Sequence, residues 1–226
     1  MRSSELDLGK YDTDKIANHY LAWYDPILEP FLKKKIDLLE LGIYKGGSLL
    51  LWRDYFLNSN IVGIDIKIPE DFQGTERIHV YKGSQTDLQF LSSVANETAP
   101  EGFDIIIDDA SHIGVLTKIA FWHLFDKHLK PGGLYVIEDW GTGYWDDFPD
   151  GKSFDLDVYS RKILLPKSSW PCHSYGMVGL VKQLIDEQGA SDVTRKGYQG
   201  KPERASKFGN MVFTPSIVFI KKANHL

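Results

Sequence analysis

Short apolar runs alternate with longer segments of mixed polarity along most of this chain, and this pattern restricts the folds that are open to it. Runs of strand length lie at 36–41, 61–66, 78–82, 103–107 and 134–137. Most of the segments between them are long enough to hold the crossover helix that joins two parallel strands. The alternation therefore predicts an α/β fold with a doubly wound, mostly parallel sheet.

The other segments complete a single domain, which we expect to cover residues 1–226. A helix at 13–32, with Trp23, Ile27 and Phe31 as one apolar stripe, predicts a helical lid over residues 1–33. Residues 141–175 are rich in aromatic residues, Gly and Pro, and we expect them to bind an acceptor substrate. Further helices are expected at 113–129 and 175–187, a surface loop at 192–209, and strands at 211–213 and 217–220.

Charge and cysteine content argue against several classes of function. The net charge of −5 gives no general attraction to nucleic acid, and no long apolar run is present to span a membrane. Residues 1–15 lack the apolar centre of a secretory signal. Cys172 is the single cysteine, which excludes an internal disulfide or a cysteine metal site and fits a reducing cytoplasm. We expect a cytoplasmic protein with no nucleic-acid or membrane partner, and exposed aromatic residues at 140–148 and 211–219 would suit a homo-oligomer.

The predicted strands lead into residues that can bind a ligand. These residues are Glu40, Asp65, Gln85, the pair Asp108 and Asp109, and the pair Glu138 and Asp139. Ligands of doubly wound sheets bind at the carboxyl ends of the strands, so these side chains should share one edge. An acid at position 65, after the glycine-containing turn at 42–48, can bind both hydroxyls of an adenosine ribose.

The glycine spacing favours S-adenosylmethionine over a nicotinamide dinucleotide. The turn reads G-x-x-x-G-G instead of G-x-G-x-x-G, and Glu40 stands just before it. A carboxylate there would repel a pyrophosphate but suits a cationic methionine group. The structural alternative is that these glycines only allow tight packing of a strand on a helix.

Several motifs in one order resemble a known family, the class I methyltransferases that act on macrolide sugars, of the mycinamicin and demethylmacrocin type. They are Thr13-Asp14-Lys15, Leu39-Glu40-Leu41-Gly42, Gly63-Ile64-Asp65, Gly83-Ser84-Gln85, Ile107-Asp108-Asp109-Ala110-Ser111-His112, Pro131-Gly132-Gly133 and Val136-Ile137-Glu138-Asp139. Cephalosporin-hydroxylase-like proteins share much of this pattern. The resemblance covers about residues 10–146, and Ala110 stands where the family usually has Gly.

The resemblance implies a Rossmann-like class I methyltransferase fold and a role for each matched residue. The methionine part of the cofactor would lie against Gly42, Gly46, Gly47 and Ser48, with Glu40 and Asp108 beside it. Asp65 would bind the ribose, and Ser84 and Gln85 the adenine edge. Thr13 and Tyr44 would also reach the cofactor, as would Lys15 on the lid that carries His19 and Tyr20. For His19 and Tyr20 an ordinary amphipathic helix is an equal alternative.

Asp109, Glu138 and Asp139 predict a metal site. Carboxylates gathered at one edge repel one another, and a hard divalent cation such as Mg²⁺ removes that repulsion through oxygen ligands. The alternative is that these acids cap the helices or loops that follow them.

His112 is the predicted general base. A sugar hydroxyl needs a proton acceptor, and a histidine at the start of a helix, close to the metal acids, can face the same pocket. The layout resembles that of catechol methyltransferases, which have Lys at the third residue after the metal-binding Asp, where this chain has His112. The alternative is a histidine that only bonds backbone at a helix start.

Aromatic side chains predict the acceptor site but leave the acceptor open. Tyr144 and Trp145, with Trp140 and Phe148, can stack on a sugar ring or on a planar polyketide. They could also merely cover the edge of the sheet. We expect methyl transfer to a hydroxyl of a small molecule, and the main hypothesis is that this molecule is a sugar or a glycosylated natural product. A catechol or phenol acceptor, a nicotinamide-dependent oxidoreductase and a non-catalytic binding module are the alternatives.

Overall fold

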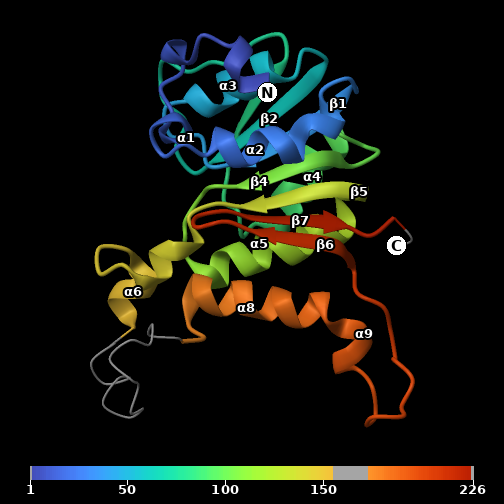
Figure 1. Ribbon diagram of the computed structural model, residues 1–226. Helices are drawn as coiled ribbons and strands as arrows, with labels where there is room; N and C mark the ends of the chain where they lie inside the picture. Colours follow the sequence, from blue (N-terminus) through green and yellow to red (C-terminus); the bar gives the residue numbers. More distant parts are fainter. Residues whose placement is uncertain (1, 155–172, 225–226) are drawn as a thin grey trace.

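The structure, a computed structural model, describes residues 2–154 and 173–224. Within these residues, one seven-stranded sheet has the order β3-β2-β1-β4-β5-β7-β6 (Figure 1). The strands are β1 (Ile36–Leu41), β2 (Ser59–Asp65), β3 (Ile78–Lys82), β4 (Phe103–Asp108), β5 (Leu129–Ile137), β6 (Phe208–Phe213) and β7 (Val218–Lys222). All pairs among β1–β5 are parallel, and β7 is antiparallel to β5 and β6. The predicted α/β class with a mostly parallel sheet is therefore confirmed.

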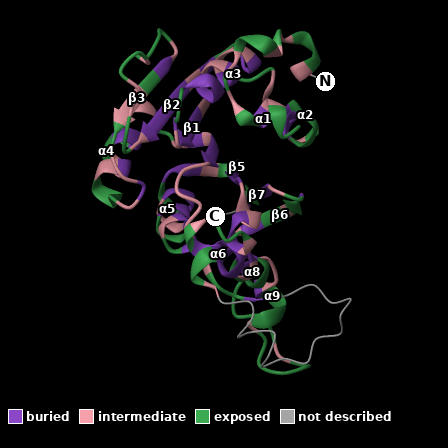
Figure 2. Cartoon of the chain, turned by 90° about the vertical axis from the view of Figure 1, so that its left-hand side faces the viewer, coloured by how far each residue is buried: buried purple, intermediate pink, exposed green. Residues whose placement is uncertain are grey.

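Helices cover both faces of this sheet. They are α1 (Asp14–Ala17), α2 (Leu21–Leu28), α3 (Gly47–Tyr55), α4 (Leu88–Thr98), α5 (Gly114–Lys127), α6 (Pro149–Ser153), α8 (Gly176–Gln188) and α9 (Ala190–Val193), with 3₁₀ turns η1 (Arg2–Glu5), η2 (Leu8–Lys10), η3 (Glu29–Phe31) and η4 (Trp140–Tyr144). One core joins the sheet to α2 and α3, and the other joins it to α4, α5 and α8. The apolar runs of the sequence thus form the strands of a buried middle layer, and the helices between them form a layer on each face of the sheet (Figure 2).

The N-terminal helix differs from the sequence prediction. It divides into α1 and α2 because His19 has a left-handed φ of 58°, which ends the first helix. The side that packs on the sheet carries Leu21, Tyr24 and Leu28, whereas Trp23 is 47% exposed. The predicted apolar stripe is therefore wrong for Trp23, whereas Ile27 and Phe31 are partly buried and pack against the same core.

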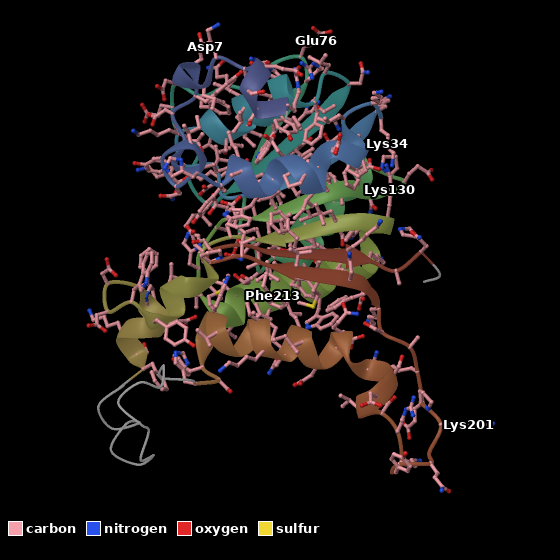
Figure 3. The ribbon with its side chains drawn as sticks, in the orientation of Figure 1. Asp7, Lys34, Glu76, Lys130, Lys201 and Phe213 are labelled. Atoms are coloured by element: carbon pink, nitrogen blue, oxygen red, sulfur yellow. The ribbon has the colours of Figure 1, made fainter. Side chains whose placement is uncertain are left out.

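The exterior carries charges of both signs. Asp7, Glu76, Lys34 and Lys201 are exposed on widely separated parts of the chain (Figure 3). Among the described residues, no helix has the length and apolar character needed to cross a bilayer. Of the predicted acceptor region 141–175, the structure describes residues 141–154, which include α6 and most of η4, and residues 173–175, which precede α8; residues 155–172 lie outside the described part of the chain.

Candidate active site

The carboxyl ends of β1, β2 and β4 surround a cavity of about 580 Å³. The N-terminal segment, residues 2–33, and the turn after β1 close this cavity on its other sides. Its lining includes the predicted residues Thr13, Gly42, Tyr44, Gly47, Ser48, Asp65, Asp109 and His112, together with Asp12, Asp14, Ala17, Ile43, Lys45 and Ala110. The sheet topology thus gathers side chains that lie up to about a hundred positions apart in the sequence.

The turn after β1 is fixed by close backbone approaches. Gly42 has a φ of 95°, and a Cβ there would lie 2.0 Å from the carbonyl oxygen of Asp109. A Cβ on Gly47 would lie 2.0 Å from the carbonyl oxygen of Asp12. The Asp65 carboxylate accepts hydrogen bonds from the backbone N–H groups of Ile43, at 2.7 Å, and Tyr44, at 3.4 Å. The glycines therefore bring the turn against both β4 and the N-terminal segment, while Asp65 holds its shape.

A second cavity of about 250 Å³ adjoins the first, and Gly42, Asp65 and Ala110 line both. Ser84 and Gln85, the predicted adenine contacts, line this second cavity. The Gln85 side chain is buried, and its Nε2 has no hydrogen-bond partner within the described structure. A buried amide without a partner costs folding free energy, so an acceptor atom of a ligand in this cavity would satisfy it.

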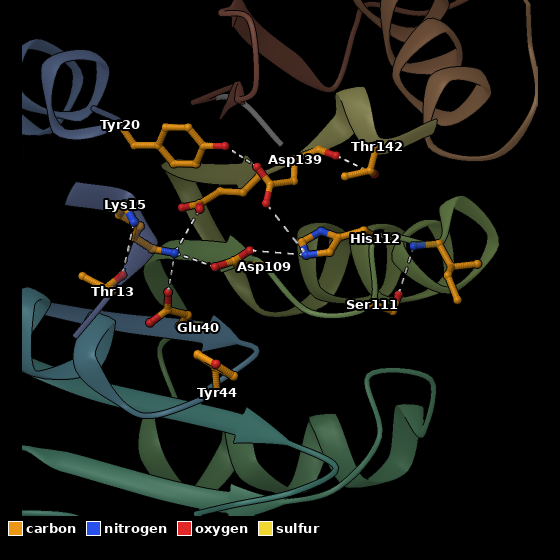
Figure 4. Close-up of polar contacts among 12 residues, drawn as sticks. Thr13, Lys15, Tyr20, Glu40, Tyr44, Asp109, Ser111, His112, Asp139 and Thr142 are labelled. Carbon is orange, nitrogen blue, oxygen red and sulfur yellow. Dashed lines mark hydrogen bonds and ion pairs between the residues drawn. The ribbon is translucent and has the colours of Figure 1, made fainter. Parts of the chain in front are cut away.

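A compact group of ligand atoms lies where β4 and β5 end. Within the described residues, one carboxylate oxygen from each of Asp109 and Asp139 and one ring nitrogen of His112 lie within 4.8 Å of one another. His112 Nε2 is 3.8 Å from Asp109 Oδ1 and 3.9 Å from Asp139 Oδ2 (Figure 4). His112 and Asp139 have φ values of 51° and 55°, a left-handed conformation that is strained for non-glycine residues.

Lys15 holds a buried ionic network beside this group. Its Nζ lies 2.6 Å from Asp109 Oδ2, 2.9 Å from Glu138 Oε2 and 3.2 Å from Glu40 Oε1 (Figure 4). Burial alone would lower the pKa of Lys15, but Asp109, Glu138 and Glu40 outweigh it and hold this pKa well above its usual value. Lys15 is therefore a buried cation that compensates part of the negative charge.

Two tyrosines of the N-terminal segment complete the network. The Tyr20 hydroxyl donates to Asp139 Oδ1, and the Tyr24 hydroxyl donates to Glu138 Oε1. Burial, and then the adjacent carboxylate, raises the pKa of each tyrosine, so both hydroxyls stay protonated and act as donors. Tyr24 was not among the residues expected from the sequence. Its spacing of four from Tyr20 on a helix was the available signal.

Four predicted cofactor residues do not line either cavity. Lys15 and Glu40 are fully buried in the ionic network, and Glu40 Oε2 also accepts from the Ser48 hydroxyl at 2.8 Å. Gly46 is the residue before α3, and its Cα lies against the ring of Phe72. Asp108 is buried beside Tyr135, and burial raises its pKa to about 7. Their assignment as cofactor contacts stays a prediction.

Aromatic residues connect His112 to the predicted acceptor residues. The Phe148 ring lies 5.8 Å from the His112 ring and 5.6 Å from Trp145, measured between centroids. Trp145 is 54% exposed, and Tyr144 packs on His173 with centroids 4.6 Å apart. An aromatic surface therefore begins next to His112 and extends to solvent.

Comparison with known proteins identifies relatives of this chain. It is 38% identical over 194 residues to the mycinamicin VI 2''-O-methyltransferase of Micromonospora griseorubida, covering 81% of this chain and 43% of that protein. It is 31% identical over 222 residues to the 8-demethyl-8-alpha-L-rhamnosyl tetracenomycin-C 2'-O-methyltransferase of Streptomyces olivaceus, covering 94% of this chain and 53% of that protein. The chain thus spans about half the length of the curated relatives it matches.

A solved structure shares the fold. MycE methyltransferase from the mycinamycin biosynthetic pathway, in complex with Mg, SAH and mycinamycin VI, matches with a TM-score of 0.67 at 31% identity, over 90% of this chain and 50% of that chain. No protein-family model matches the chain. The expected resemblance is confirmed: the chain has the Rossmann-like class I methyltransferase fold and is a homologue of the macrolide and sugar O-methyltransferases of the mycinamicin, demethylmacrocin and tetracenomycin type.

Proposed function

We propose that this chain transfers a methyl group from S-adenosylmethionine to a hydroxyl of a small molecule, with the help of a divalent cation such as Mg²⁺. The observation that carries the proposal is the position of the Asp109, His112 and Asp139 group, since Asp109 and His112 line the cavity formed by the Gly42–Ser48 turn. The proposed acceptor is a sugar of a glycosylated natural product, because the relatives named above are sugar O-methyltransferases.

The two joined cavities fit the cofactor. The larger cavity would hold the methionine part, between the glycine turn and Thr13. Asp65 borders both cavities and would meet the ribose between them. The unpartnered Nε2 of Gln85 would donate to a ring nitrogen of adenine, with Ser84 beside it.

The carboxylates fit a hard divalent cation. Asp109 Oδ1 and Asp139 Oδ2 both face His112, and they would offer one oxygen each. Mg²⁺ in proteins often binds through one or two carboxylates and keeps several water molecules. The Glu138 carboxylate is bound to Lys15 and Tyr24, so we propose Asp109 and Asp139 as the direct ligands and Glu138 as a neighbouring anion.

His112 would accept the proton of the acceptor hydroxyl at Nε2. When bound, the cofactor supplies an electrophilic methyl group and the cation lowers the energy of the developing alkoxide. Asp109 and Asp139 hold His112 between them, and Phe148 lies against its ring. The residues of the Gly42–Ser48 turn would hold the cofactor, which would supply the methyl group, and His112 would keep the proton that the acceptor hydroxyl gives up.

Trp145 and Phe148 would bind the acceptor ring beside His112. Tyr144 packs on His173, and it would also contact the acceptor next to Trp145 and Phe148. Cytoplasmic location, a homo-oligomeric state and the lack of a nucleic-acid partner remain predictions from the sequence.

Calorimetric titration and a methyl-transfer assay test the proposal. We expect the protein to bind S-adenosylhomocysteine and not NAD, and to methylate mycinamycin VI or another glycosylated natural product. Activity should disappear with EDTA and return with Mg²⁺. Binding of NAD alone, or full turnover in metal-free protein, would refute the proposal, and turnover only with catechols would change the acceptor class.

A further inference from the structure

We propose that Tyr20 is a positioning residue for the metal: its hydroxyl occupies one oxygen of Asp139 and so turns the other oxygen toward the cation. This inference rests on the metal-dependent function proposed above. It assigns to the N-terminal segment a role in metal binding that is separate from contact with the cofactor.

Asp139 divides its two oxygens between two directions. Oδ1 accepts the hydrogen bond from Tyr20, and Oδ2 faces His112 Nε2 at 3.9 Å. Tyr20 is 6% exposed, so its ring is fixed by packing and its hydroxyl has little freedom to leave the carboxylate. Figure 4 shows the tyrosine approaching Asp139 from the side opposite His112.

Asp109 is divided in the same way. Its Oδ2 is bound to Lys15 Nζ at 2.6 Å, and its Oδ1 faces His112 Nε2 at 3.8 Å. Two carboxylates from two different strand ends therefore each have one oxygen held by the N-terminal segment and the other turned to the same place. Such a pair presents two single oxygens, a ligand set that suits Mg²⁺ with its remaining positions filled by water or acceptor oxygens.

Glu138 provides the contrast within the same network. Tyr24 donates to its Oε1, and Lys15 lies 2.9 Å from its Oε2, so both oxygens are engaged by the N-terminal segment. Tyr20 and Tyr24 are one helical turn apart and both bond a carboxylate, yet only the partner of Tyr20 belongs to the metal-ligand group within the described residues. The two tyrosines thus form a matched pair for an experiment.

The experiment compares Tyr20→Phe with Tyr24→Phe by measuring Mn²⁺ affinity, using electron paramagnetic resonance titration of the full chain. Each change removes one hydroxyl and keeps the ring. We expect Tyr20→Phe to weaken Mn²⁺ binding by about 10–100-fold, as for other residues that orient metal ligands. We expect Tyr24→Phe to keep the wild-type affinity and to lower only the melting temperature, because it leaves Oε1 of Glu138 without a donor while Lys15 still binds Oε2.

The outcomes separate this inference from the proposed function. If Tyr20→Phe keeps the wild-type affinity, or if both variants weaken binding equally, the positioning role is wrong while metal binding by the wild type still stands. If wild-type protein does not bind Mn²⁺, the metal-dependent function fails and this inference fails with it. Circular dichroism of both variants checks that each is folded during the titration.

Discussion

His112 occupies a position that fits two chemical roles. Its Nε2 is almost equally far from Asp109 and Asp139, so it could accept a proton from the acceptor or serve as a third ligand of a cation. The residues that face it fit both roles, because two carboxylates can orient an imidazole and can also bind a metal ion. A variant that removes the imidazole separates them.

The first prediction concerns His112→Ala. If His112 is the base, the turnover number should fall by about 10²–10⁴-fold while Mn²⁺ and S-adenosylhomocysteine affinities stay at wild-type values. Single-turnover kinetics and calorimetry measure these quantities. A loss of Mn²⁺ affinity would instead identify a ligand, and wild-type turnover would show that neither role is needed.

The second prediction concerns Lys15→Met. This change leaves Asp109, Glu138 and Glu40 next to one another in a buried region without their common cation. Removing one partner of a buried ion pair typically lowers the free energy of unfolding by about 3–5 kcal/mol. Urea denaturation at neutral pH measures the loss.

Lys10→Met is the control for that measurement, because Lys10 is a nearby lysine that is 71% exposed and pairs with Asp7 at 3.4 Å. Exposed ion pairs contribute little to stability, so this variant should unfold like the wild type. Equal stability of the Lys15 and Lys10 variants would mean that the buried network does not depend on its cation.

At the scale of elements, the junction between the N-terminal segment and α3 determines the shape of the proposed cofactor site. The start of α3 packs on the backbone of Asp12, and Gly47 leaves no room for a side chain there. Because Asp12, Thr13 and Gly47 all line the larger cavity, a displacement at this junction changes the cavity directly.

The third prediction is that Gly47→Ala weakens S-adenosylhomocysteine binding by about tenfold, which corresponds to about 1.4 kcal/mol. The added Cβ would lie 2.0 Å from the Asp12 carbonyl oxygen and must displace the segment. Gly209→Ala on β6 is the matched control, since its Cβ would lie 3.7 Å from the nearest atom. Unchanged calorimetric affinity in Gly47→Ala would separate the junction from cofactor binding.

The elements that the sequence predicted well are those with a strong local signal. Each predicted strand is an apolar run, and the five parallel strands lie within a few residues of their expected bounds, except that β5 begins at Leu129. Helix α4 was not among the expected elements, although its buried residues Leu91, Val94 and Ala95 recur at the three- and four-residue spacing of a helix face. The segment 13–32 was predicted as one continuous helix because nothing in the local pattern indicates a left-handed residue at His19.

The site was predictable in part for a similar reason. Strand ends of a parallel sheet share one edge, so the meeting of Asp109, Asp139 and His112 could be expected from order alone. Which carboxylate pairs with Lys15, Tyr20 or Tyr24 depends on contacts between side chains that are far apart in the sequence. The pairing of Lys15 with Glu138 spans 123 positions, and no local pattern encodes it.

At the scale of the whole molecule, the ionic network joins the N-terminal segment to three strands of the sheet. Glu40 belongs to β1, Asp109 follows β4 and Glu138 follows β5, and Lys15 contacts all of them. A ligand that reduces the repulsion among these carboxylates should therefore stabilise the global fold and not merely a loop.

The fourth prediction follows from that connection. Mg²⁺ at about 100 times its dissociation constant should raise the free energy of unfolding by about 2.7 kcal/mol, and the melting temperature with it. Differential scanning calorimetry measures the shift. The double variant Asp109→Asn and Asp139→Asn should lose it, and a shift that persists in this variant would place the cation elsewhere.

The left-handed backbone at His112 and Asp139 has a consequence for the balance between stability and activity. A side chain held in this conformation costs about 1–2 kcal/mol, whereas glycine adopts it without strain. His112→Gly should therefore melt at a higher temperature than His112→Ala, although both lack the imidazole. Selection for thermostability alone would then favour glycine at this position, so a histidine there points to selection for catalysis.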